Sequence, residues 1–212
     1  MKFIRLITIS MFLVSNFSYA LSAETDEIES TLLERHNYYR GIAGIPLMKW
    51  NDGLATLAQK WANTLKKNGC KMKHSSHSFR KNVAGFSYIG ENLYWRGSSA
   101  PFAMSADYAQ NGVDNWYTEI RDFQYSEKGV ICPLRGKKGA IGHFTQVMWD
   151  KSIELGCAYA QCSGGKSMVL VCHYGPGGNF NMRSTPPFDA SAAARLNAHE
   201  INKQFGGLPT CR

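Results

Sequence analysis

The chain has 212 residues, of which 44% are hydrophobic, and its formal net charge at pH 7 is +8. This length is typical of a single domain that buries its own hydrophobic core, and the sequence shows no internal repeat. The positive charge favours anionic partners, but no nucleic-acid-binding module is visible, and we expect no nucleic-acid partner.

The first twenty residues have the pattern of a secretory signal peptide. A basic start, Met1–Arg5, precedes an apolar run over residues 6–14, and small residues surround Ala20. The run is too short to span a bilayer, and no later run is long enough. We predict cleavage after Ala20, or alternatively after Ala23, which leaves a secreted, extracellular domain of residues 21–212. The other interpretation of this stretch is a buried N-terminal helix.

All six cysteines fall in the predicted mature chain. This content fits an oxidising compartment, so we expect three disulfide bonds. The spacings do not match a zinc site, since Cys157 and Cys162 lie on predicted strands rather than in a knuckle.

The first half of the chain predicts three helices. Apolar residues at helical spacing indicate a helix over residues 26–40, with acidic residues in its first turn, and a second helix over 52–67. Asn51 can cap the second helix. Residues 70–89 are polar and read as irregular, and a third helix is predicted over 105–120.

The second half predicts two strands and a short helix. The strands cover residues 155–161 and 168–174, and a turn at Ser163–Lys166 joins them. An irregular C-terminal extension begins at about residue 181. It contains an Ala-rich segment, 190–205, that we expect to form a short helix. Its inward-facing residues would be Leu196, Ile201 and Phe205.

The predicted strand pair fixes one disulfide bond. If the turn centres on Gly164 and Gly165, Cys157 lies directly opposite Cys172, at a distance that suits a disulfide. Cys162 is an odd number of residues from Cys157, so its side chain points to the other face of the sheet and needs another partner.

Two short sequence segments give most of the evidence about function. In Gly142–Trp149, His143 and Gln146 would share a face on a helix, and Val147 and Trp149 would lie in a core. The second run, Val171–Phe180, has a glycine-rich end without the Lys-Ser/Thr of a phosphate-binding loop. We therefore interpret this end as a structural turn.

Together, and in this order, the two runs resemble the signature motifs of the CAP superfamily. This superfamily includes cysteine-rich secretory proteins, insect antigen 5, plant pathogenesis-related 1 proteins and helminth venom-allergen-like proteins. Arg35–Arg40 and Gly90–Trp95 resemble shorter patterns of the family. The resemblance covers about residues 28–180 and is greatest to the secreted venom-allergen-like proteins.

The resemblance implies an α+β fold, a three-layer α-β-α sandwich with a small, mainly antiparallel sheet between helices. It also makes Cys70 the family-like partner of Cys162. Elimination then leaves a third bond between Cys132 and Cys211.

The resemblance further places four side chains around one cleft: His74, Glu91, Glu119 and His143. His77 competes with His74 for its role. Two imidazoles can hold a divalent cation such as zinc, and a nearby carboxylate can orient a ligand or act as a general base. The alternatives are a non-catalytic metal site, a catalytic site, and carboxylates that only fix loops to the sheet.

We expect this domain to act by binding, not catalysis, with zinc not required. The family is associated with sterol and fatty-acid binding and with host or defence interactions. An aromatic group suits a lipid groove: Trp95, Phe102, Tyr108, Trp116 and Tyr117. The rivals are a zinc-dependent hydrolase that uses the His/Glu cleft and an effector that binds sulfated polysaccharide (glycosaminoglycan). The basic residues for the latter are Lys66, Lys67, Lys71, Lys73, Arg80 and Lys81, and, in a second cluster, Arg135, Lys137 and Lys138.

Overall fold

The computed structural model describes residues 26–123, 125, 140–182 and 185–199. Its main sheet has four strands in the order β1-β5-β6-β4. β1 runs parallel to β5, and the other two pairs are antiparallel, as predicted. The strand bounds are Lys49–Trp50 (β1), Gly90–Gly97 (β4), Glu154–Cys162 (β5) and Ser167–Gly175 (β6).

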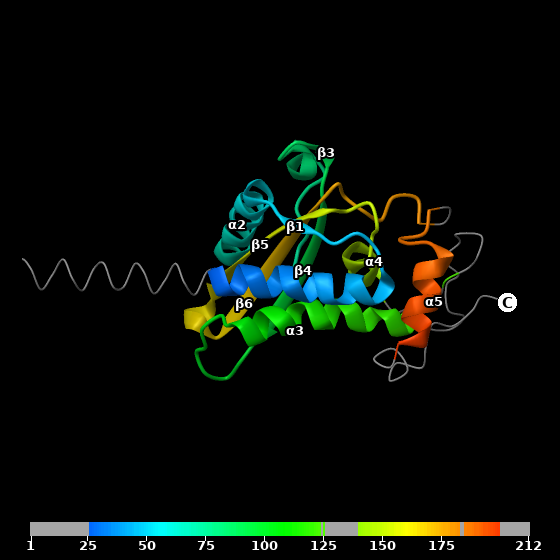
Figure 1. Cartoon of the computed structure of the whole chain (residues 1–212). Helices are drawn as coiled ribbons and strands as arrows, with labels where there is room; N and C mark the ends of the chain where they lie inside the picture. The colour runs from blue at the N-terminus through cyan, green and yellow to red at the C-terminus, as the bar shows by residue number, and fades with distance from the viewer. Residues whose placement is uncertain (1–25, 124, 126–139, 183–184, 200–212) are drawn as a thin grey trace, which may run out of the picture.

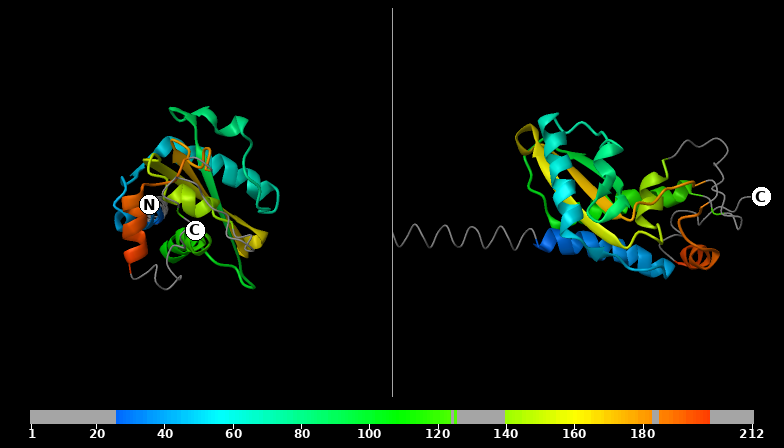
Figure 2. Two further views of the ribbon diagram at one scale, coloured as in Figure 1. Left: turned by 90° about the vertical axis from the view of Figure 1, so that its right-hand side faces the viewer. Right: turned by 90° about the horizontal axis from the view of Figure 1, so that it is seen from above.

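Helices cover both faces of this sheet (Figures 1 and 2). On one face lies α2, Asp52–Lys67, whose residues Ala58, Ala62 and Leu65 pack with Leu93, Val169 and Val171 of the strands. On the other face, the N-terminal helix (residues 26–43) and α3 (Ala106–Tyr117) run side by side. They enclose the larger core, to which β6 contributes Met168, Leu170, Cys172 and Tyr174. The three-layer α-β-α arrangement predicted from the sequence is therefore confirmed.

The β5–β6 hairpin has the predicted register. Its strands are joined by a single 3-10 turn, η3 (Ser163–Gly165), in which Gly164 has a φ of 63°. This left-handed conformation suits glycine. Cys157 faces Cys172, and the two are bonded, with a Cα–Cα distance of 4.1 Å. Cys162 points to the α2 face and is bonded to Cys70, so two of the three predicted disulfide bonds are confirmed.

The helix boundaries follow local capping chemistry. The Asn51 side chain accepts a hydrogen bond from the Leu54 amide at 2.9 Å, so α2 begins where predicted. The third predicted helix instead changes at Tyr117 into a 3-10 helix, η2 (Thr118–Asp122). The C-terminal helix, α5, covers Ala190–Ala198 and ends before its predicted limit, with Leu196 buried as expected.

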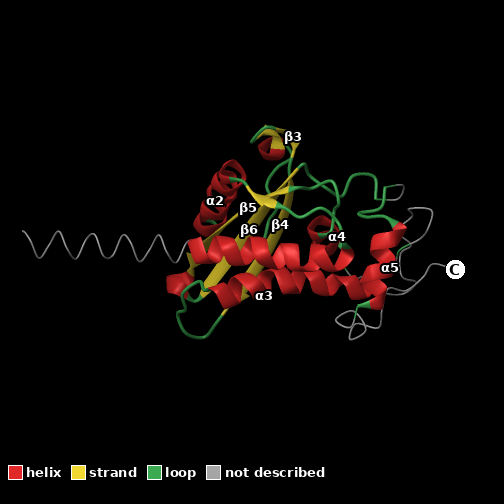
Figure 3. Ribbon diagram, in the orientation of Figure 1, coloured by secondary structure: helices red, strands yellow, loops and turns green. Residues whose placement is uncertain are grey.

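The segment predicted to be irregular, residues 70–89, contains regular structure. It holds a 3-10 turn, η1 (Ser78–Arg80), and a two-stranded hairpin of β2 (Lys81–Val83) and β3 (Phe86–Tyr88) (Figure 3). Gly85, with a φ of 84°, allows the tight turn between these strands. Each strand has only three residues, too few for an alternating pattern to be visible in the sequence.

A buried arginine joins the N-terminal helix to α4, Gly142–Val147. Arg40 is fully buried, and its guanidinium donates hydrogen bonds to four backbone carbonyl groups. The acceptors are Pro46 at 2.7 Å, Val147 at 2.7 Å, Trp149 at 3.0 Å and Ser152 at 2.8 Å. Burial lowers the pKa of Arg40 to about 10, which leaves the group charged at neutral pH.

Several predictions fall on residues outside the described part of the chain. These are the signal peptide over residues 1–20, the Cys132–Cys211 bond, the basic cluster of Arg135, Lys137 and Lys138, and the inward-facing Ile201 and Phe205. Within the described residues, no helix is long and apolar enough to cross a membrane.

Candidate functional site

The first half of the site is centred on Glu91, near the start of β4. Its carboxylate oxygen Oε1 lies 2.7 Å from His74 Nδ1 and accepts the Ser75 amide at 2.9 Å. Its other oxygen, Oε2, lies 3.1 Å from Nε2 of His173, the residue directly opposite on β6. The side chains of Glu91 and His173 are fully buried, whereas that of His74 is 53% exposed.

Hydrogen bonding keeps Glu91 ionised despite this burial. Desolvation on its own would raise the pKa of the carboxyl group. The hydrogen bonds from His173, His74 and Ser75 outweigh that effect and hold the pKa of Glu91 well below its usual range. With a carboxylate at Oε1, the His74 ring carries its proton on Nδ1. Its Nε2 lone pair is therefore left for another partner.

The second half pairs Glu119, in η2, with His143, the second residue of α4. Glu119 Oε1 lies 2.6 Å from His143 Nδ1. Glu119 Oε2 accepts the backbone amides of His143 at 2.9 Å and Phe144 at 3.2 Å. The carboxylate therefore caps the first turn of α4 and orients the imidazole at the same time.

Further contacts hold this second pair in place. The His143 ring stacks on Trp116, with ring centroids 6.3 Å apart and planes at 16°. The Trp116 indole donates to the Leu93 carbonyl at 2.9 Å, which ties this ring to β4. The Asn92 side chain donates to the carbonyl of His143 and to the hydroxyl of Tyr174, both at 3.1 Å. His143 is therefore fixed by η2, α3 and β4 together.

Both pairs are attached to β4, an edge strand of the main sheet. Successive side chains of a strand point to opposite faces. Glu91 lies with His173 on the α2 face, whereas Asn92 reaches His143 and Tyr174 on the other. The structure therefore forms two carboxylate–histidine pairs from the four predicted residues. His77 stacks on Tyr88 instead, with ring centroids 5.0 Å apart.

The remaining polar residues of the two motifs are structural. Gln146 turns into the core, where it donates to Ser152 Oγ at 3.0 Å and accepts the Gly178 amide at 2.9 Å. Asn179 binds Thr145 and the Gly142 carbonyl. Val147 and Trp149 are buried, as predicted. The glycine-rich run after β6, together with Asn179, therefore packs against α4.

The donor set is smaller than that of a catalytic zinc site. Two imidazoles, each backed by a carboxylate, match the way proteins orient histidine ligands. Catalytic zinc sites use three protein ligands and a water molecule. Among the described residues, no group of three or more His, Cys, Asp or Glu is placed to hold a metal ion.

His173 is the main site residue that sequence reasoning missed. It lies within the second motif, but its role depends on the pairing of β4 with β6. These strands are far apart in the chain, and no local turn sets their register. The sequence therefore held no signal that placed His173 beside Glu91.

Comparisons with known proteins agree with this fold and motif order. The Cysteine-rich secretory protein family, CAP, matches residues 33–174. Human GLIPR1-like protein 1 is 31% identical over 94% of this chain and 78% of its own length. Pathogenesis-related protein 1 of Arabidopsis thaliana is 32% identical over 76% of this chain and 83% of its own length.

A solved structure supports the fold alone. BmVAL-1 superposes with a TM-score of 0.63 at 22% identity, covering 77% of this chain and 82% of that one. The family match spans more than half of the sequence and includes the first motif and the start of the second. This chain therefore belongs to the cysteine-rich secretory protein (CAP) family.

Proposed function

We propose that this protein is a secreted, extracellular binding protein, active in host or defence interactions, that holds a divalent cation such as Zn²⁺ weakly. One observation carries the metal proposal: His74 and His143 each have Nδ1 bound to a carboxylate, which leaves Nε2 to bind a cation. His74 and His143 are the ligands, and Glu91 and Glu119 orient them. A bound zinc ion would supply Lewis acidity, but two protein ligands favour binding over hydrolysis.

Zinc titration tests this proposal. We expect isothermal titration of the intact protein at neutral pH to show one weak zinc site. The double variant His74→Ala/His143→Ala should lose it, while the matched variant His77→Ala should keep it. Glu119→Gln should weaken binding by about ten- to a hundredfold, because the imidazole loses its orienting partner.

Two outcomes would contradict the zinc proposal: no heat with the intact protein, or binding that persists in the double variant. Affinity should also fall as the pH is lowered, because protons compete with the cation for the imidazole nitrogens. EDTA-sensitive hydrolysis of an ester or peptide that the double variant cannot perform would favour the hydrolase instead.

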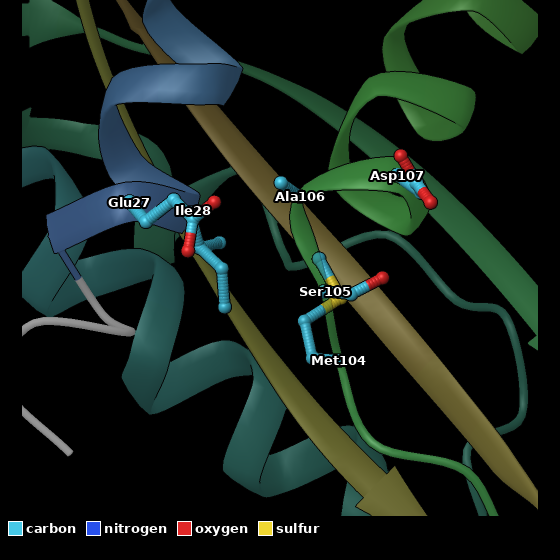
Figure 4. Close-up of a pocket in the computed structure, with 6 residues that line it drawn as sticks. All are labelled: Glu27, Ile28, Met104, Ser105, Ala106 and Asp107. Carbon is cyan, nitrogen blue, oxygen red and sulfur yellow. The ribbon is translucent and has the colours of Figure 1, made fainter. Parts of the chain in front are cut away.

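A hollow favours lipid as a second ligand class. A cavity of about 430 Å³ lies where the N-terminal helix meets the start of α3 (Figure 4). Its apolar lining is Ile28 and Met104, both buried, together with Ala106, whereas Glu27 and Asp107 are exposed carboxylates. Ile28, Met104 and Ala106 could contact a sterol ring or an acyl chain, while Glu27, Ser105 and Asp107 make the other half of the lining polar. The two carboxylates would repel a fatty-acid head group, so we propose a neutral sterol as the preferred lipid.

The aromatic residues that suggested a lipid groove differ in burial and do not form one group in the structure. Trp116 and Tyr117 are buried in the core, whereas Trp95 is 48% exposed. Phe102 and Tyr108 contact each other, with ring centroids 5.1 Å apart. The sterol proposal therefore rests on the hollow and not on these rings.

Binding of labelled cholesterol and palmitate tests the sterol proposal. We expect saturable cholesterol binding that survives EDTA, because apolar burial drives it, and weaker binding of palmitate. The surface variant Glu27→Lys/Asp107→Lys should shift the preference towards palmitate, whereas Asp52→Lys/Asp150→Lys, with the same charge change elsewhere, should not. Binding of neither lipid, or an equal response to both variants, would refute the proposed site.

A further inference from the structure

Every Lys, Arg, Asp or Glu in the stretch from Gly53 to Gly90 is a basic residue. It contains six lysines and one arginine but no aspartate or glutamate. Lys66 and Lys67 end α2, where they complement the helix dipole, but the other lysines have no such role. No lysine of the described ranges takes part in an ion pair. The positive charge of this stretch is therefore available to a partner.

Part of this charge borders a hollow at the C-terminal end of α2. The hollow has a volume of about 290 Å³ and is lined by Trp61, Leu65, Asn68, Lys71 and Lys73. Leu65 is buried and Trp61 is half-buried, whereas both lysines are exposed. Trp61 and two exposed lysines thus line the same small space.

The walls of the hollow are held by bonds within the protein. The Trp61 indole donates to the Lys73 carbonyl at 3.0 Å, and the Cys70 amide donates to the Leu65 carbonyl at 2.8 Å. The bond between Cys70 and Cys162 fixes the same segment to β5. A ligand would therefore meet walls that are already ordered, which lowers the entropic cost of binding.

Only some residues of the basic cluster predicted from the sequence lie at the hollow. Arg80 is half-buried, and its guanidinium lies 5.2 Å from the centroid of the Tyr88 ring and donates to the Ser75 carbonyl. Arg80 does not line the hollow. Lys71 and Lys73 line the hollow, and Lys66 and Lys67 lie in the last turn of α2.

We propose that this hollow binds one sulfated sugar unit of a glycosaminoglycan-type polysaccharide. The apolar C–H face of a sugar ring can pack on the Trp61 indole, while sulfate groups pair with the ammonium groups of Lys71 and Lys73. Lys66 and Lys67 extend the positive surface for neighbouring sulfates of a linear chain. The residues that line this hollow are not those of the proposed zinc and sterol sites, although Lys73 directly precedes His74 in the chain.

Heparin-affinity measurements on the mature protein test the proposal. Lys71→Glu/Lys73→Glu should weaken binding at least about tenfold, because two attractive charges become repulsive. Lys49→Glu/Lys151→Glu makes the same net-charge change at exposed positions outside the stretch and should have a much smaller effect. Retention should fall steeply with salt.

A spectroscopic measurement separates a specific site from general attraction. A heparin hexasaccharide should shift the NMR signal of the Trp61 indole N–H, and the desulfated hexasaccharide should not. The proposal is overturned if both double variants bind heparin equally, or if the indole signal is unaffected at saturation. It is also overturned if phosphatidylserine vesicles bind through Lys71 and Lys73 while the hexasaccharide does not.

Discussion

Replacing Arg40 with methionine is expected to lower the free energy of unfolding by about 3–5 kcal/mol. The guanidinium donates to four carbonyl groups, three of them just beyond the end of α4 or at its last residue. Methionine fills similar space but leaves these buried acceptors without their donor, and each unsatisfied acceptor costs about 1–3 kcal/mol. Removal of a buried charge offsets only part of that cost.

Urea unfolding at neutral pH measures this effect. Lys60→Met is the control, because it removes one positive charge from an exposed position of α2. We expect the control to change the free energy of unfolding by less than about 0.5 kcal/mol. An Arg40→Met variant as stable as the control would show that the buried hydrogen bonds are not needed.

Between pH 6.5 and pH 5, the protein is expected to lose about 2 kcal/mol of stability because of His36. The residue is fully buried, and its Nδ1 lies 2.7 Å from the Leu32 carbonyl, so Nδ1 carries the proton of the neutral ring. Nε2 then accepts from the Tyr174 hydroxyl at 2.9 Å. Desolvation lowers the pKa of His36 from 6.5 to about 4, and the nearby charge of Arg40 adds to this effect.

The sign follows from the proton affinities of the two states. The unfolded chain binds the proton more readily than the folded protein, so falling pH favours unfolding from about pH 6.5 until the folded pKa, about 4, is passed. His36→Gln should remove most of this pH dependence, whereas His77→Gln, which changes an exposed histidine, should retain it. An NMR titration in which the buried His36 ring protonates near pH 6.5 would refute this account.

Local structure and the hairpin could be predicted from the sequence for identifiable reasons. Asn51 and helical spacing predicted α2, and a single turn set the register that pairs Cys157 with Cys172. These features depend on residues close together in the chain. The early end of α5 was missed, because the capping residue His199 carries no typical stop signal.

The site could be predicted only in part. The family resemblance named His74, Glu91, Glu119 and His143, and the structure pairs them as two carboxylate–histidine units. The pairing itself, and the role of His173, depend on strands and loops that are distant in sequence. Short strands such as β2 and β3 also leave no alternating pattern, so residues 70–89 read as irregular.

The Cys70–Cys162 bond closes a covalent ring of the chain. It joins residues separated by 92 positions, and all four predicted cleft residues lie inside the ring. A single proteolytic cut between Cys70 and Cys162 would open the ring but would not release a fragment, since the disulfide still connects both pieces. In an extracellular setting with proteases present, His74, Glu91, Glu119 and His143 would thus remain part of one covalent molecule after such a cut.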